Sequence, residues 1–263
     1  MVPTSEDVSY SVAERVATVT ITREKRRNAL NSDVLRALIA AFGQAKADPE
    51  VRVVVLTGAG DRSFSAGGDL APGGMMGKGP LATHWDRAEF VRTLLAMRDL
   101  GKPLVARVNG AALGGGFGLL LGCDIAIGRD DAKIGCPEID VGLFPMMIMA
   151  LIFRNVPRKV GMELILTARR ITGAEAVGYG ILNRAVAADA LDAAVNEMTA
   201  NLASKSPAIL RLGLNAFHTM SDMAYEDALT HLHTQLTINT LAEDAGEGIM
   251  AFLQKRKPEW KGR

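Results

Sequence analysis

Short strand-like segments alternate with amphipathic helical segments through the first two thirds of the chain, and this order restricts the fold more than any other feature. Residues 8–12 and 16–21 alternate in the strand period around a polar turn, which predicts a hairpin. Residues 31–48 begin with Asn and Ser cap candidates and carry apolar side chains at helical spacing. The further strands predicted from buried apolar runs lie at residues 51–58, 103–110 and 123–128.

Helices are predicted between and after these strands. One lies around residues 85–100, and another begins within Gly114–Gly116 and ends at Gly122. From Pro145 onward the sequence is mostly helical, with apolar stripes at a period of 3.6 residues. The order predicts an α/β core over residues 1–200, followed directly by a helical C-terminal region over residues 201–263.

Composition excludes several classes of protein. Lys and Arg number 30 against 29 Asp and Glu, so no global basic field exists to attract nucleic acid or anionic lipid. No apolar run approaches the roughly 20 residues that span a bilayer, and the first ten residues lack the features of a signal peptide. We therefore expect a soluble cytoplasmic protein that binds neither nucleic acid nor membrane.

The cysteines and histidines give no metal or redox signature. Cys123 and Cys136 lack the CxxC spacing, so both are interpreted as packing residues of a reducing compartment. His231 and His233 are two positions apart on a predicted helix and face different directions. No metal site is expected.

One glycine pattern resembles a dinucleotide site but fails in its context. The buried run at residues 51–57 leads into Gly58-Ala-Gly60-Asp-Arg-Ser63, close to the GxGxxG pattern. Ser63 stands at the third glycine position, and the glycine-rich sequence that continues to about Lys78 cannot begin a helix at once. A nicotinamide cofactor is not expected.

Two other glycine loops, residues 65–70 and 109–118, each follow a predicted strand. Glycine lets the backbone approach a ligand closely and turns free N–H groups toward it. If both loops converge, and if a helix begins at Gly115 or Gly116, their N–H groups can stabilise a developing oxyanion. The alternative is that the loops are only tight turns.

At this point the sequence resembles the crotonase family, the enoyl-CoA hydratases and isomerases. The resemblance runs from about residue 10 to the C-terminus. It is carried by six ordered segments: RRNALN, VVVLTGAG…FSAGGDL, PLVARVNGAALGGGFGLLLGCDIAIG, IGCPEIDVGLFP, ELILTARRITGAEAVGYGILNRAV and AFLQKRKPEW. It implies a spiral of β-β-α units with C-terminal helices that form trimers, which often pair as hexamers. It also implies an acyl-CoA substrate, no separate cofactor, and an oxyanion hole formed by the N–H groups of Gly68 and Gly115.

The acidic residues divide the possible activities. Hydratases of the family use two glutamates, and this chain keeps only one, Glu138, because Gly118 stands where the other would be. Hydration needs one group to activate water and another to protonate carbon, whereas moving a double bond needs a single group. Isomerisation of enoyl-CoA by Glu138 is therefore favoured. The alternatives are a hydratase with a second acid from elsewhere, such as Asp140, and a non-catalytic acyl-CoA-binding protein.

The resemblance also implies residues that contact the substrate. Arg26, with its neighbour Arg27, lies near the adenosine phosphates, and Lys255 reaches the CoA site of a neighbouring subunit. Asp69 and Leu70 lie beside the pantetheine and adenine, chiefly through backbone contacts. The further substrate-binding positions are Ala66, Gly68, Gly115, Gly118 and Met146. Apolar residues near Glu138 should raise its pKa; the candidates are Phe144, Met146, Met147 and Met149. Acyl chain length, stereochemistry and pathway are not specified by these residues.

Overall fold

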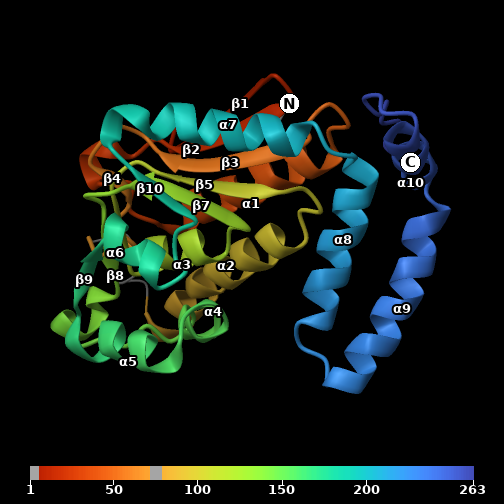
Figure 1. Cartoon of the computed structure of the whole chain (residues 1–263). Coiled ribbons are helices and arrows are strands. Elements are labelled where there is room, and N and C mark those ends of the chain that lie inside the picture. Colours follow the sequence, from red (N-terminus) through yellow and green to blue (C-terminus); the bar gives the residue numbers. More distant parts are fainter. Residues whose placement is uncertain (1–5, 72–78) are drawn as a thin grey trace.

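The computed structural model describes residues 6–71 and 79–263. The end of the glycine-rich stretch that was expected to reach Lys78, and the first residues of the chain, lie outside these ranges. The fold is mixed α/β and contains two sheets (Figure 1). The larger sheet has the order β1-β2-β3-β5-β7-β10, with strands β1 (Val8–Ala13), β2 (Val16–Ile21), β3 (Val53–Gly58), β5 (Leu104–Val108), β7 (Ile125–Arg129) and β10 (Arg184–Val186).

The predicted hairpin and the three predicted strands are confirmed. Strands β1 and β2 pair antiparallel, with Val8 opposite Ile21 and Ala13 opposite Val16. The neighbours from β2 to β10 are parallel. All six residues of β3 are buried, as expected for a central parallel strand covered on both faces.

Helices cover both faces of this sheet. Helix α1 (Ser32–Ala47) begins as predicted, because the side chain of Asn31 accepts a hydrogen bond from the N–H of Val34. Helix α2 (Pro80–Arg98) starts earlier than expected, with proline in its first turn, where the missing N–H costs nothing. On the opposite face, α7 (Leu191–Ala203) packs its apolar side onto β3, β5 and β7.

A smaller sheet was not predicted. It has the order β4-β6-β8-β9 and consists of three-residue strands: β4 (Ser63–Ser65), β6 (Ala111–Leu113), β8 (Lys133–Gly135) and β9 (Arg170–Thr172). Gly58 therefore leads into a strand and not into a helix, which agrees with the rejection of a dinucleotide site. The region after Pro145 is mostly helical as expected, but β9 and β10 interrupt it.

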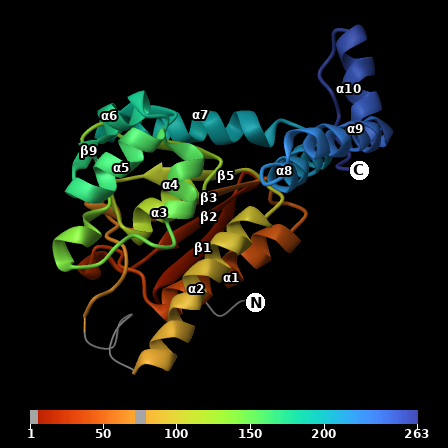
Figure 2. The same ribbon diagram turned by 90° about the horizontal axis from the view of Figure 1, so that it is seen from below.

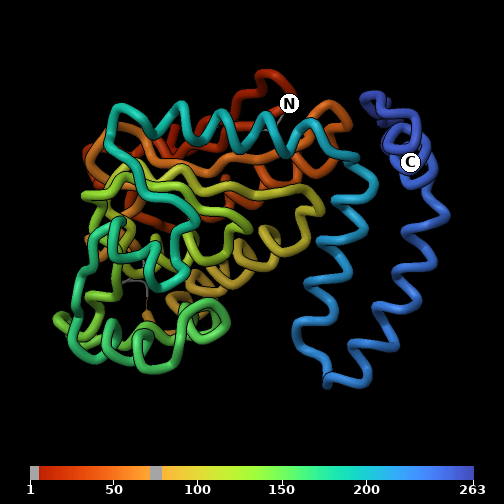
Figure 3. Tube along the Cα trace, viewed as in Figure 1, coloured from red at the N-terminus to blue at the C-terminus, as the bar shows by residue number. Residues whose placement is uncertain are grey.

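The remaining helices complete the core and form an extension. The core helices are α3 (Gly115–Leu121), α4 (Met149–Asn155), α5 (Arg158–Thr167) and α6 (Gly173–Gly178), with 3-10 turns η1 (Glu24–Arg26), η2 (Pro137–Val141) and η3 (Ala188–Ala190). After α7 the chain leaves the core through α8 (Pro207–Met220), α9 (Tyr225–Leu241) and α10 (Glu243–Leu253), which stand beside it (Figures 2 and 3). Across the described ranges, no helix has both the length and the apolar character needed to cross a bilayer.

Candidate active site

The two glycine loops meet at Gly67 and Gly115. A Cβ atom built on Gly67 would lie 3.1 Å from the Gly115 nitrogen and 2.7 Å from the Leu113 oxygen. Gly67 has φ +89°, so a side chain here would be strained as well as crowded. Glycine is therefore required for the close approach of the two loops, which lie against each other at this point.

The backbone of Gly68 turns its N–H away from the neighbouring chain segment. Gly67 O accepts from Leu30 N at 2.8 Å, and Asp69 N donates to Leu30 O at 2.8 Å. Because alternate residues of an extended segment face opposite sides, the N–H of Gly68 points away from Leu30. Within the described residues it has no hydrogen-bond acceptor, and Gly68 is exposed.

Gly115 provides the second N–H at this place. It is the first residue of α3, and the N–H groups of a first helical turn have no acceptor within the helix. The preceding Gly114 donates its own N–H to Gly135 O at 3.0 Å, which fixes the entry into the helix. Each loop therefore has a free N–H close to the place where the loops meet, directly after Gly67 in one loop and at Gly115 in the other.

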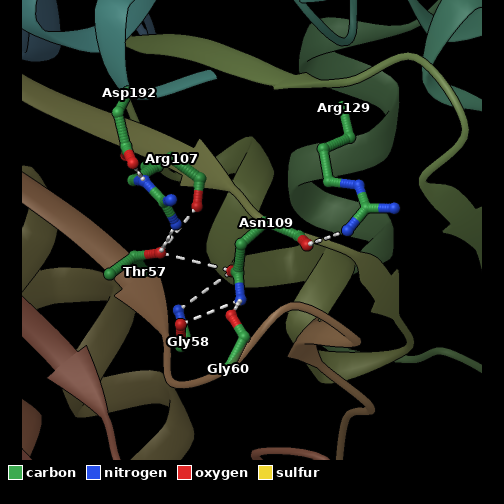
Figure 4. Close-up of polar contacts among 7 residues, drawn as sticks. All are labelled: Thr57, Gly58, Gly60, Arg107, Asn109, Arg129 and Asp192. Carbon is green, nitrogen blue, oxygen red and sulfur yellow. Dashed lines mark hydrogen bonds and ion pairs between the residues drawn. The ribbon is translucent and has the colours of Figure 1, made fainter. Parts of the chain in front are cut away.

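Asn109 holds the frame of these loops (Figure 4). Its buried side-chain amide nitrogen lies 2.9 Å from Gly58 O and 2.8 Å from Gly60 O, and its Oδ1 accepts from Gly58 N at 3.2 Å. The hydroxyl of Thr57 is 3.2 Å from the same Oδ1. One side chain thus ties the end of β3, which leads toward β4 and the first glycine loop, to the end of β5, where the second glycine loop begins.

Arg23 anchors the Gly68 loop from the other side. It forms an ion pair with Asp69 at 3.0 Å and with Asp7 at 3.3 Å, and donates to Ala29 O at 2.7 Å. Both the carboxylate and the N–H of Asp69 are therefore used within the protein, which leaves its carbonyl for a ligand. Arg23 was missed in the sequence because its partners are distant along the chain.

Glu138 lies against the start of α3. It is on η2, directly after β8, and a Cβ built on Gly114 would lie 2.8 Å from its Oε1. Gly114 has φ +51° and ψ −122°, which suits glycine. The sequence-predicted acid and one of the predicted glycine loops are thus brought together.

The carboxyl group of Glu138 is poorly solvated. Its Oε2 is buried and has no hydrogen-bond partner among the described residues. Burial raises the pKa of Glu138 above its ordinary value, while the hydrogen bond from its own backbone N–H acts in the opposite direction. A carboxyl with a raised pKa and a free oxygen is suited to accept and return a proton.

The space over Gly118 is filled by apolar side chains. A Cβ at this position would lie 2.5 Å from Ile148 Cγ2 and 3.1 Å from Phe90 Cζ. Both residues are almost fully buried. The other candidate for a second acid, Asp140, is exposed on η2. Sequence reasoning did not find Phe90 or Ile148, because they come from segments on either side of α3 in the chain.

The methionine-rich segment after Glu138 is only partly core. Phe144 and Met149 pack against the core, whereas Met146 is 67% exposed and Met147 is also exposed. Met146 and Met147 are therefore not core residues, and the apolar wall beside Glu138 stays a prediction. Met146 lies on the turn between η2 and α4, open to solvent.

The predicted CoA-binding residues lie at two separate places. Arg26 and Arg27 are exposed on the turn at η1, and Arg27 O accepts from Ala66 N at 3.0 Å, so this turn is joined to the Gly68 loop. Leu70 is exposed beside it. Lys255 follows α10, which lies on the side of the molecule away from α6 and β9 in both ribbon views (Figures 1 and 2).

Burial affects the chemistry of both cysteines. Both cysteines are free, and burial raises the pKa of the Cys123 and Cys136 thiols. In the described part of the chain, no group of His, Cys, Asp and Glu is arranged to hold a metal ion.

The chain is similar to known proteins over nearly its whole length. Residues 11–263 match the family described as enoyl-CoA hydratase/isomerase. A (E)-benzylidenesuccinyl-CoA hydratase of Thauera aromatica is 31% identical, over 97% of this chain and 99% of the relative. A carnitinyl-CoA dehydratase of Salmonella arizonae is 33% identical, over 98% and 99%. The crystal structure of an enoyl-CoA hydratase of Mycobacterium smegmatis superposes with a TM-score of 0.92 at 34% identity, covering 97% of this chain and 99% of that one.

Proposed function

The chain belongs to the enoyl-CoA hydratase/isomerase family, and from this membership we propose that it moves a proton on an acyl-CoA thioester with Glu138 as its single acid–base group. The net reaction is the isomerisation of an enoyl-CoA double bond. The observation that carries the proposal is the half-buried carboxyl of Glu138 beside Gly114, at the start of α3, together with the apolar filling over Gly118.

The two N–H groups hold the thioester oxygen. Removal of a proton from carbon places negative charge on that oxygen, and the N–H groups of Gly68 and Gly115 stabilise this charge more strongly than they stabilise the neutral carbonyl. Each donor of such an oxyanion hole is typically worth about 10²–10³ in rate. The free N–H of Gly68 and its position beside the start of α3 support this role.

Glu138 carries the proton. Its carboxylate removes a proton from C2 of a 3-enoyl thioester, and the electron pair moves to the thioester oxygen as an enolate. The enolate then takes the same proton back at C4, which leaves the double bond between C2 and C3. No water enters this sequence, so a second carboxylate is not needed.

Hydration or dehydration is the second candidate. The relatives at 31% and 33% identity are named as a hydratase and a dehydratase, which favours chemistry that adds or removes water. In that case a second acid must come from elsewhere, and Asp140 is the nearest candidate in sequence. The filled space over Gly118 favours isomerisation.

The test is turnover of both substrates by the wild type and by Glu138→Gln. The wild type should convert 3-enoyl-CoA into 2-enoyl-CoA and hydrate trans-2-enoyl-CoA only weakly. Glu138→Gln should abolish the conversion and bind CoA nearly as well, because the amide has the size of the carboxylate but takes no proton. Efficient hydration with no action on 3-enoyl-CoA would reject isomerisation, and no turnover of either substrate would favour a non-catalytic binding protein.

We further propose that the chain assembles as a trimer or a pair of trimers, which brings Lys255 to a neighbouring CoA site. The C-terminal helices expose large apolar side chains, including Leu241 at 79% and Phe252 at 83%. Such a surface favours association with other copies of the chain. Light scattering at micromolar concentration should report an oligomer; a monomer would remove Lys255 from the CoA site and leave Arg26 as the phosphate ligand.

A further inference from the structure

The backbone of Gly118 is closed off by side chains from two other elements. Ile148, just before α4, and Phe90, on α2, are 4% and 3% exposed and cover Gly118 at the distances given above. Real Cβ atoms essentially never approach another atom within 3.0 Å, so no side chain fits at Gly118 unless Ile148 moves. Ile148 and Phe90 therefore occupy the space that a side chain at position 118 would need.

The ring of Phe90 also covers the start of α3. Phe90 Cε2 lies 3.5 Å from where a Cβ of Gly115 would be, and Leu30 Cδ1 lies 3.3 Å from it. The Phe90 ring thus extends along the first turn of α3, from the proposed oxyanion donor at Gly115 to Gly118.

Glu138 lies at the start of the same helix. Its carboxyl contacts Gly114, and Gly118 N donates to Gly114 O at 3.0 Å, so the two glycines are one helical turn apart. Gly115, which the Phe90 ring covers, follows Gly114 directly in the chain. The carboxyl of Glu138 and the ring of Phe90 therefore lie over consecutive glycines at the start of α3.

We propose that Phe90 and Ile148 determine the specificity of the reaction, because they keep water from a fixed position opposite Glu138. This rests on the proposed function. A water that attacks a double bond must be held by two to four polar partners, and this pair offers none. The site therefore favours unsaturated acyl thioesters that undergo proton transfer between two carbons, with no bond formed to oxygen.

The test compares Ile148→Ala with Ile152→Ala. Both changes truncate a buried isoleucine, but the nearest atoms over Gly118 belong to Ile148 and Phe90, whereas Ile152 is nearest at Gly161. The measured quantity is the ratio of 3-hydroxyacyl-CoA to isomerised enoyl-CoA formed from one substrate. Ile148→Ala should raise this ratio about tenfold or more, within the range of discrimination that apolar pockets reach. Ile152→Ala should leave it unchanged.

Phe90→Leu provides a second variant if Ile148→Ala does not fold. It removes the ring edge over Gly118 but keeps an apolar side chain, and it should raise the same ratio. An unchanged ratio in the folded variants, or an equal rise in Ile152→Ala, would overturn the proposal. A separate experiment tests the proposed function itself. If Glu138 is not the acid–base group, Glu138→Gln should still exchange the C2 protons of the substrate with D₂O.

Discussion

Gly114→Ala should reduce both the stability of the protein and its turnover, and the loss of turnover should be specific to this position. Alanine at φ +51° is strained, which costs of the order of 1–3 kcal/mol in the free energy of unfolding. Its Cβ would also lie 2.8 Å from Glu138 Oε1 and 3.3 Å from the carboxyl carbon. The carboxyl must therefore retreat by roughly 0.5 Å, the limit within which catalytic groups have to be held. Since a displacement of about 1 Å can cost 10²-fold in rate, we expect kcat/KM to fall about 10–100-fold.

Gly180→Ala is the matched control for this change. Gly180 has φ +74°, but nothing lies within 4 Å of a Cβ built on it, so the variant adds backbone strain without a contact. The assay is conversion of 3-enoyl-CoA to 2-enoyl-CoA, with thermal unfolding measured on both proteins. The two variants should lose similar stability, and only Gly114→Ala should lose activity. Unchanged turnover in folded Gly114→Ala would refute the reasoning that this glycine positions Glu138.

Three further predictions concern stability. Burial raises the pKa of Glu138, so the folded state binds this proton more tightly than the unfolded state, and the contribution of Glu138 to stability falls as pH rises above 4.5. Glu138→Gln should therefore be more stable than the wild type at about pH 8, with the difference gone near pH 4 in urea titrations. Asn109→Ala leaves buried backbone groups unpaired and should lower the free energy of unfolding by about 2–3 kcal/mol, whereas no change would mean that water replaces the amide. Gly118→Glu should lower the free energy of unfolding by about 1–3 kcal/mol through overpacking, and adding Ile148→Ala to the same chain should restore part of this loss. Equal stability of Gly118→Glu and wild type would contradict the distances over Gly118.

The features that could be predicted from the sequence are those with a local pattern. The hairpin, β3 and the cap at Asn31 follow from apolar period and side-chain chemistry within a few residues. The three-residue strands of the small sheet could not be predicted, because they are too short to show a period and depend on partners far along the chain. The glycine loops and Glu138 were predicted from the family resemblance. That the Glu138 carboxyl lies against Gly114 could not be predicted, because this contact joins segments that are apart in the sequence.

The packing around Gly118 is another feature that could not be predicted from the sequence. The sequence indicates that a carboxylate is missing at this position, and it does not indicate what fills the space. Phe90 and Ile148 read as ordinary core residues of two helices, and only the packing of α2 and the segment before α4 onto α3 brings them over this glycine. Contacts between segments distant in sequence are set by packing and not by local propensity.

The most direct test of Glu138 as the single acid–base group follows a deuterium label within one turnover. A 3-enoyl-CoA that carries deuterium at both C2 positions is mixed with excess enzyme, and the product is analysed by mass spectrometry and NMR. If one poorly solvated carboxyl removes and returns the proton, part of the 2-enoyl-CoA product should carry deuterium at C4. A product with hydroxyl at C3 and no deuterium transferred to C4 would contradict the account.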